Sequence, residues 1–430
     1  MKADESEARL LEGDGQEEAS RSMVCNRRVV SLCLSTFCLM LGTGMATPTV
    51  PALVRSLDRS ASSVGLALSA FGGSRLAANI PIGWAADAYG RKPVLVFGGL
   101  LTGLGTFLSA FAPDTLSFVA TRAIAGAGNA CYLGSAFVYL AESSTPKNRA
   151  RVLGANQAAL QTAVTIGPTL GGYVAATYGL RSPFLVIGFF SFLSAVSTLF
   201  FADKDQKKEK PSSKRAEESV FLVVMSIIKD LRFLSVGACH FCAFALRQGG
   251  RNLLMALVAT TTFGYDPKSL GALYGLMALI DLALLAPAST LSDLLADDRR
   301  FVAVPALILN GVAVALVGCV AQTKNHNVFL GALVLWAVSA GFLGPTLPAF
   351  AADVALPAHR ALFISLFRSC GDLGFLFAPY LVGILLDTYG PRVAGFALTA
   401  FVTLVALFFA KYGLTTPQLP QGPDDVSHRP

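Results

Sequence analysis

The chain has 430 residues, of which 53% are hydrophobic and only 14% charged, and its formal net charge is +7. Soluble globular proteins carry about 25% charged residues, so this composition excludes a soluble domain and indicates a polytopic membrane protein. The net charge could suggest nucleic-acid binding, but the basic residues lie mainly in alternate loops, which is a topology signal. The chain has no nucleophile–base set or nucleotide-binding loop, so it is not expected to be an enzyme or to hold a cofactor.

Apolar stretches recur along the whole chain, each long enough at ~1.5 Å per residue to cross a ~30 Å hydrocarbon core. They predict an all-α membrane protein with twelve transmembrane helices in two pseudo-symmetric six-helix bundles. In chain order the helices are expected at residues 29–54, 62–84, 93–112, 115–141, 150–175, 182–202, 232–261, 268–290, 300–321, 328–351, 361–386 and 391–411.

A charge-rich stretch in the middle of the chain separates two sets of six helices. After this stretch, apolar residues recur on one face from Val220 to Ile228, so a short interfacial helix is expected there. The predicted regions are a disordered cytosolic N-terminus (1–28), an N-terminal bundle (29–202), a cytosolic linker with the interfacial helix (203–231), a C-terminal bundle (232–411) and a cytosolic tail (412–430).

The loops on the N-terminal side hold more Lys and Arg than those on the opposite side. This bias places both termini in the cytoplasm, with the chain in the plasma membrane or an organelle membrane. Most cysteines fall inside predicted helices, where they act as small apolar residues. Cys239, His240 and Cys242 have no second ligand pair nearby, so no metal site is expected.

The two halves of the chain repeat one another. The residues of one block recur 211 positions later in the chain, and those of a second block recur 206 positions later. Two similar halves are what alternating access requires, because rocking one half against the other exposes a central site to each side in turn. The matched pairs include Glu142 and Asp353, Pro168 and Pro379, Gly172 and Gly383, Gly65 and Gly271, Pro81 and Pro287, and Asp87 and Asp293.

The loop between the second and third helices carries Gly83, Asp87, Gly90, Arg91 and Lys92. It resembles the loop signature of the major facilitator superfamily. In that resemblance the glycines let the helix ends approach closely and the acid lies near a neighbouring helix N-terminus. The two basic residues would pair with carboxylates across the cytoplasmic gate.

Helix four has Arg122 followed by two glycines and Asn129, which is similar to a motif of proton-coupled members of the superfamily. Helix five has Gly167, Pro168, Gly171 and Gly172, which resemble the antiporter motif. These small residues also suit close helix packing, and a proline-bent helix with such a face could belong to the moving interface.

The resemblance covers residues 29–411 and indicates the twelve-helix drug:proton antiporter-like branch. It implies a secondary active transporter that moves a small organic solute by alternating access, coupled to protons by antiport. An organic-anion facilitator or symporter is the alternative, and a transporter-like receptor without flux is a third. The implied partners are a small-molecule substrate that could be anionic, protons and the lipid bilayer. We expect a monomer.

Ionisable residues within the spans are candidate substrate or coupling sites, because each is costly in a membrane. Counting ~1.5 Å per residue from the loop charges puts Arg75, Asp281 and Asp372 at one level. In the superfamily fold, helix two lies beside helix eleven and helix eight beside helix five. Arg75 is therefore expected to pair with Asp372, and Asp281 with Gln157 or Gln161, either as a coupling element or as a satisfied polar contact. The seven candidates are Arg75, Arg122, Arg247, Arg251, Asp281, Arg368 and Asp372.

Helix seven contains Arg247 and Arg251, four residues apart and therefore on one face. Gly249 and Gly250 between them loosen the helix, where unwinding could expose backbone groups to a ligand. The two arginines could instead snorkel or pair with acids; a substrate-facing role would indicate a substrate with a carboxylate, a phosphate or another acceptor-rich group. Further candidate cavity residues, which could equally join helices, are Asn129, Tyr132, Gln157 and Gln161.

Overall fold

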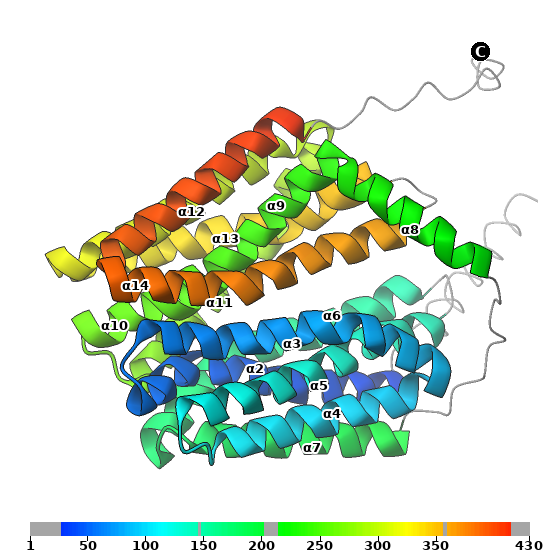
Figure 1. The fold of residues 1–430 in the computed structure, drawn as a ribbon, viewed down its shortest axis with the longest axis horizontal. Coiled ribbons are helices and arrows are strands. Elements are labelled where there is room, and N and C mark those ends of the chain that lie inside the picture. The colour runs from blue at the N-terminus through cyan, green and yellow to red at the C-terminus, as the bar shows by residue number, and fades with distance from the viewer. Residues whose placement is uncertain (1–26, 145–147, 202–213, 356–358, 414–430) are drawn as a thin grey trace, which may run out of the picture.

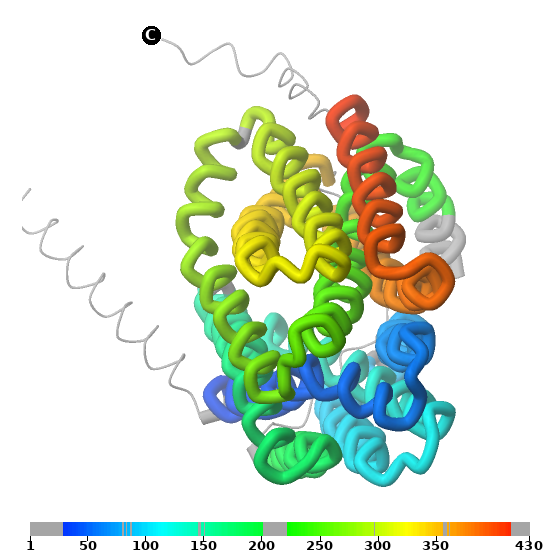
Figure 2. The backbone as a smooth tube through the Cα atoms, turned by 90° about the vertical axis from the view of Figure 1, so that its left-hand side faces the viewer, coloured from blue at the N-terminus to red at the C-terminus, as the bar shows by residue number. Residues whose placement is uncertain are grey.

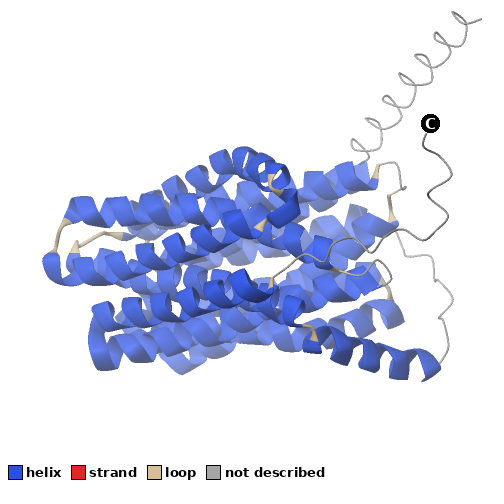
Figure 3. Ribbon diagram, turned by 90° about the horizontal axis from the view of Figure 1, so that it is seen from above, coloured by secondary structure: helices blue, strands red, loops and turns tan. Residues whose placement is uncertain are grey.

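The computed structural model describes residues 27–144, 148–201, 214–355 and 359–413, and within these ranges it contains helices and no strand (Figure 3). The predictions for most of the N-terminus, the start of the linker and the C-terminal tail lie outside the described residues. The helices are α2 (Arg27–Leu57), α3 (Ala61–Tyr89), α4 (Arg91–Ser109), α5 (Thr115–Glu142), α6 (Arg149–Tyr178), α7 (Ser182–Phe201), α8 (Lys214–Lys229), α9 (Leu231–Ala245), η1 (Leu246–Met255), α10 (Ala256–Thr262), α11 (Pro267–Leu294), η2 (Ala296–Asp298), α12 (Arg300–Thr323), α13 (His326–Val354) and α14 (Arg360–Tyr412).

The predicted set of twelve spanning helices is confirmed. The helices α9, η1 and α10 follow one another without a break and form one span. The long helix α14 counts as two spans, because Gly390 interrupts it with a φ of 80°, a conformation that favours glycine. By length and apolar composition alone, eight of the described helical segments could cross a membrane, and one of them, Leu362–Tyr412, includes both halves of α14.

Several helices begin at an acidic or hydroxyl side chain that accepts a hydrogen bond from a first-turn amide. Asp114 accepts from Ser117 N at 2.8 Å at the start of α5, and Asp266 accepts from Ser269 N at 3.0 Å at the start of α11. Ser60 caps α3 in the same way. These caps satisfy amides that have no partner inside the helix, and so they set where the connecting turns end.

The helices form two bundles, α2–α7 and α9–α14, which lie one above the other in Figure 1 and are seen along their helices in Figure 2. Small residues let helices within a bundle pack closely. A Cβ on Gly98 would lie 2.5 Å from the backbone nitrogen of Tyr132, and one on Gly105 would lie 2.5 Å from that of Ala125. The backbones of α4 and α5 therefore touch, as expected where lipid supplies no hydrophobic driving force.

The bundles meet at the end that carries the α2–α3 and α10–α11 connections, which we call the closed end. Gly65 of α3 faces the carbonyl oxygen of Pro379 on α14, and Gly271 of α11 faces that of Pro168 on α6. A Cβ on Gly271 would lie 2.5 Å from that oxygen, so neither glycine can be replaced without moving the opposite helix. The residues that repeat in the sequence thus form two equivalent seams between the bundles.

Asp387 of α14 adds a polar contact to only one of these seams. Its Oδ1 accepts from the backbone nitrogen of Ala61 and its Oδ2 from that of Ser62, both at 2.8 Å. The carboxylate therefore caps α3 from the opposite bundle, where the helix dipole also favours a negative charge. At the equivalent position on α6 the chain has Ala176, so the second seam lacks this contact.

The bundles diverge toward the other end, the linker end, where α7 leads to α8 (Figure 1). Here the ion pairs that we describe lie within a bundle. Arg91 pairs with Glu142 at 3.5 Å, and Arg299 pairs with Asp353 at 2.7 Å and with Asp293 at 3.0 Å. Glu142 and Asp353 are repeat equivalents. Each bundle therefore pairs a loop arginine with a carboxylate at the same position of the repeat.

Arg91 was expected to pair across the gate; its contact with Glu142 joins α4 to α5 of the same bundle. Gly90 takes a φ of 96° between α3 and α4, and this requires glycine. Lys92 is half-buried at the start of α4. Gly83 and Asp87 lie in the last turns of α3, and the side chain of Asp87 lies outside the described part.

The middle of helix seven is a π-helix and is not unwound. The segment η1 carries Gly249 and Gly250, both buried. A Cβ on Gly249 would lie 2.9 Å from Val382 on α14, and one on Gly250 would lie 2.8 Å from Val314 on α12. The glycine pair thus serves helix packing, and the wider helical turn replaces the expected break; such π segments often occur at functional sites.

We predict that Asp387→Asn weakens the closed end, because the amide lacks the charge that caps α3. The loss should shift the balance between closed and open by about 1 kcal/mol, roughly fivefold. Hydrogen–deuterium exchange mass spectrometry should show faster exchange at the start of α3 and slower exchange at the linker end. Asp114→Asn, which removes the same charge from a cap within one bundle, should change exchange only at the start of α5. A purely local effect of Asp387→Asn would contradict the prediction.

Candidate functional site

The first polar contact inside the membrane joins the two bundles. Arg75 Nη2 of α3 lies 3.5 Å from Asp372 Oδ1 of α14, and Asn79 Nδ2 donates to Asp372 Oδ2 at 3.1 Å. The predicted pairing of Arg75 with Asp372 is confirmed, and Asn79 completes it. Asp372 is only 7% exposed, so both carboxylate oxygens are held by groups of the opposite bundle.

Asp281 of α11 has a different environment from the one expected. Its Oδ1 is buried without a hydrogen-bond partner, and no described atom of Gln157 or Gln161 bonds to it. It interacts electrostatically with Arg251 and Arg247 of η1. The predicted bond between Asp281 and a glutamine of α6 is therefore wrong, and the charged groups that influence this carboxylate are the arginines of helix seven in its own bundle.

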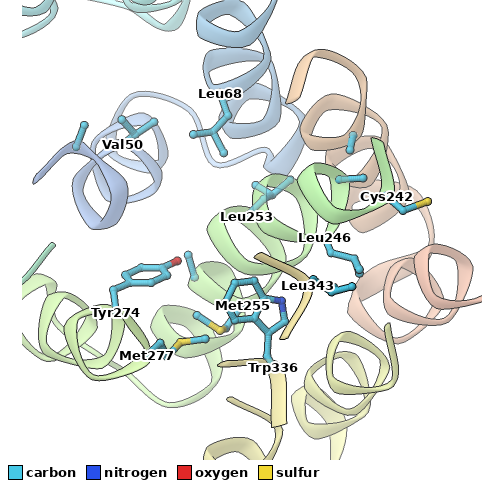
Figure 4. Packing of buried hydrophobic residues seen from close by; sticks show 14 of the residues in the cluster. Val50, Leu68, Cys242, Leu246, Leu253, Met255, Tyr274, Met277, Trp336 and Leu343 are labelled. Carbon is cyan, nitrogen blue, oxygen red and sulfur yellow. The ribbon is translucent and has the colours of Figure 1, made fainter. Parts of the chain in front are cut away.

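Arg251 lies between two aromatic rings. Its Cζ is 4.9 Å from the centre of the Tyr274 ring on α11 and 5.0 Å from that of the Trp336 ring on α13. Tyr274 Oη also donates to the backbone carbonyl of Arg251 at 2.9 Å. Figure 4 shows Tyr274 and Trp336 beside Met255 in the packed interior of this bundle. Cation–π contacts thus hold a guanidinium that is 7% exposed.

Arg247 and Arg368 differ from Arg251 because both are exposed. Arg368 Cζ of α14 lies 5.5 Å from the centre of the Phe137 ring on α5, in the opposite bundle. Both arginines interact electrostatically with His240, whose ring stacks on Phe367 at 4.0 Å. Arg247 and Arg251 are four residues apart and were expected to share one face of the helix. The Arg247 side chain is exposed, however, whereas that of Arg251 is enclosed.

The helix-four candidates are buried. Arg122 is 6% exposed, and its Cζ lies 4.5 Å from the centre of the Phe71 ring of α3. Asn129 is 1% exposed, and neither of its side-chain polar atoms has a hydrogen-bond partner. Tyr132 is fully buried, whereas Gln157 and Gln161 of α6 are exposed. The structure therefore places the glutamines, and not Asn129 or Tyr132, on an accessible surface.

The antiporter-like residues of α6 face two neighbours. A Cβ on Gly167 would lie 2.7 Å from the Cα of Gly44 on α2, and Gly171 packs against Met45 of the same helix. A Cβ on Gly172 would lie 2.9 Å from the Cα of Gly271 on α11. Through Gly167 and Gly171, α6 packs on α2 of its own bundle. Through Gly172 and the Pro168 carbonyl, it meets α11 of the other bundle at the second seam.

The sequence analysis did not single out Asp387, Asn79 or the two aromatic partners of Arg251. Asp387 was absent from the candidates, although an acid near the end of an apolar helix is a signal for a contact with a helix terminus. Tyr274 and Trp336 were missed because the partner of an arginine in a cation–π contact cannot be read from spacing.

Among the described residues there is no cluster of three metal-ligating side chains.

Comparisons with known proteins agree with this architecture. The family model described as Major Facilitator Superfamily matches residues 32–256 and 236–428. Multidrug resistance protein 2 of Bacillus subtilis is 25% identical over 89% of this chain and 95% of its own length. Quinolone resistance protein NorA of Staphylococcus aureus is 23% identical over 57% of this chain and 62% of its own length.

Two solved structures have a similar fold. A bacterial homolog of the human lysosomal transporter Spinster, in an inward-facing and occupied conformation, superposes with a TM-score of 0.72 at 15% identity, covering 92% of this chain and 97% of its own. The human organic anion transporter MFSD10 gives 0.63 at 18% identity, covering 89% and 98%. The chain belongs to the major facilitator superfamily and is a secondary transporter, not an enzyme.

We predict that Asp372→Asn lowers stability, because Arg75 then loses its ion-pair partner inside the membrane. The expected cost is about 1–3 kcal/mol, below that of a fully buried pair, since the Arg75 side chain is 25% exposed. The double variant Arg75→Met with Asp372→Leu should recover most of this loss, because it removes both charges. The midpoint of thermal unfolding in detergent measures both effects. A double variant less stable than the single one would contradict the prediction.

Proposed function

We propose that this protein exchanges a small organic solute for protons by alternating access, and that Asp281 carries the coupled proton. The observation that supports the assignment is the contrast between the two carboxylates in the spans. Asp372 is bound by Arg75 and Asn79, whereas Asp281 is partly exposed and its Oδ1 has no hydrogen-bond partner.

A carboxylate near arginines can gain and lose a proton as its surroundings change. Asp281 interacts with Arg251 and Arg247, so protonation would remove the only negative charge of this group and leave η1 with unopposed positive charge. That change would favour a different position of helix seven and therefore of the C-terminal bundle. Names of the bacterial relatives, which refer to multidrug and quinolone resistance, agree with exchange of an organic solute.

The two seams would be the moving contacts. Gly172 and Pro168 on α6 meet Gly271, and Gly65 meets the Pro379 carbonyl, so small residues lie where the bundles must separate. We assign the loop residues Gly83, Asp87, Gly90, Arg91 and Lys92 to the gate, whereas Gly167 and Gly171 support α6 by packing on α2 of the same bundle. Arg122 would stabilise α3 through Phe71 and influence coupling only indirectly.

The excess of Lys and Arg in the loops of the linker end supports cytoplasmic termini. On this orientation the bundles diverge toward the cytoplasm, which agrees with an inward-facing conformation, the state named for the Spinster homolog. We infer that a single chain performs the whole cycle, because both seams and the charged residues between them belong to one chain. The plasma membrane or an organelle membrane would contain it.

We predict that Asp281→Asn abolishes accumulation of a solute driven by an imposed pH gradient while leaving solute counterflow within about a factor of a few of wild type. Proteoliposomes should first be screened with organic solutes, with and without the gradient. Asp372→Asn is the matched control, since any transport that remains in it should stay coupled to pH. Accumulation at the wild-type level in Asp281→Asn would remove this residue as the proton carrier.

A further inference from the structure

Three of the five arginines within the spans are in contact with other protein groups, although the Nε of each is buried without a hydrogen-bond partner among the described residues. Arg75 pairs with Asp372 at 3.5 Å. Arg122 lies against Phe71, and Arg251 lies between Tyr274 and Trp336; both are less than a tenth exposed. These contacts account for the charges that would otherwise meet the hydrocarbon core. The remaining two, Arg247 and Arg368, require a different explanation.

Arg247 and Arg368 are exposed and make no ion pair among the described residues. A free guanidinium presents five N–H donors in a fixed plane that matches a carboxylate or phosphate. Exposure of such groups within a membrane protein is typical of a water-filled cavity and not of a lipid-facing surface.

The two side chains lie on different helices, Arg247 on η1 and Arg368 on α14. His240 of α9 is within electrostatic range of both, which indicates that they lie in one region of the molecule. Arg368 also contacts the ring of Phe137, which belongs to the opposite bundle. Arg368 therefore points into the space between the bundles, which is where transporters of this kind bind their solutes.

The charges in this region do not balance. Asp281 is the carboxylate that interacts with Arg247 and Arg251, and one negative charge cannot offset both. Arg368 adds a further positive charge, while Asp372 is already held by Arg75 and Asn79. The region therefore carries an excess of positive charge that an anion would neutralise.

We propose that the solute is an organic anion with an apolar body, whose acidic group binds Arg247 and Arg368. This proposal rests on the transport function proposed above and names its substrate class. The apolar body would lie against Phe137, which is 47% exposed, and the edge of Phe244, which is half-buried and contacts the His240 ring at 5.0 Å. Arg251 belongs to the structural support of η1 and would not touch the anion.

The test uses three ligands of one shape and different charge: naphthoate, the neutral naphthamide and the cationic naphthylmethylamine. Isothermal titration calorimetry on the full chain in detergent should show binding of naphthoate and much weaker binding of the other two. Arg247→Gln and Arg368→Gln should each weaken naphthoate binding about tenfold, as expected for the loss of one charged contact. Arg247→Lys and Arg368→Lys should lose less, because they keep the charge.

Arg392→Gln is the control, since Arg392 is an exposed arginine of the same helix that lies 3.4 Å from Gln322, beyond the break at Gly390. It should leave naphthoate binding unchanged. Equal binding of all three ligands, no naphthoate binding to the wild type, or unchanged affinity in both glutamine variants would overturn the proposal. If these variants lose the anion but still accumulate another solute in a pH gradient, only the substrate class is wrong. If naphthoate binds through both arginines but no solute responds to the gradient, the proton coupling is wrong instead.

Discussion

A charged group inside a lipid bilayer needs either a partner or water, and this requirement organises the centre of the molecule. The chain meets it in different ways. Arg75 and Asp372 pair across the bundles, and Arg251 is enclosed by two aromatic rings. Arg247 and Arg368 remain exposed. The distinction between arginines held by protein groups and exposed arginines separates the residues that support the fold from those that are available to a ligand.

The same requirement explains why the contacts between the bundles at the closed end are made mostly by small, uncharged residues. At the closed end, glycines meet proline carbonyls and leave little room for any side chain. Contacts of this kind can separate without leaving a charge unpaired, which suits surfaces that must open. At this end Asp387 adds a charged contact, because it bonds two amides of α3 and makes one seam more polar than its repeat equivalent.

The pseudo-symmetry of the fold therefore does not extend to its chemistry. Both bundles hold a loop arginine with an equivalent acid, Glu142 in one and Asp353 in the other. The carboxylate of Asp281, however, occupies the position that Arg75 has in the first bundle, and the π-helix η1 lies in the second bundle. The repeated helices form the two bundles that move relative to each other. The residues that differ between the repeats include the polar groups that could bind a solute or couple its transport to protons.

The predicted helices agree with the structure to within a few residues, because long apolar runs bounded by polar loops have one stable arrangement in a bilayer. The Arg75–Asp372 pair also followed from counting residues along helices that were expected to be neighbours. Neither kind of inference needs side-chain geometry. Counting failed for Asp281, because spacing along a helix does not say toward which neighbouring groups a carboxylate turns.

The sequence by itself determined the membrane class, the twelve spans, the repeated halves and the polar residues that must be accounted for. These follow from hydropathy and periodicity, which are properties of local segments. The tertiary structure alone decided which arginines are enclosed and which are free, that helix seven widens at η1, and that Asp387 reaches across to α3. Each of these depends on the direction of a side chain relative to a helix far away in the chain, and packing sets that direction only after the bundles have assembled.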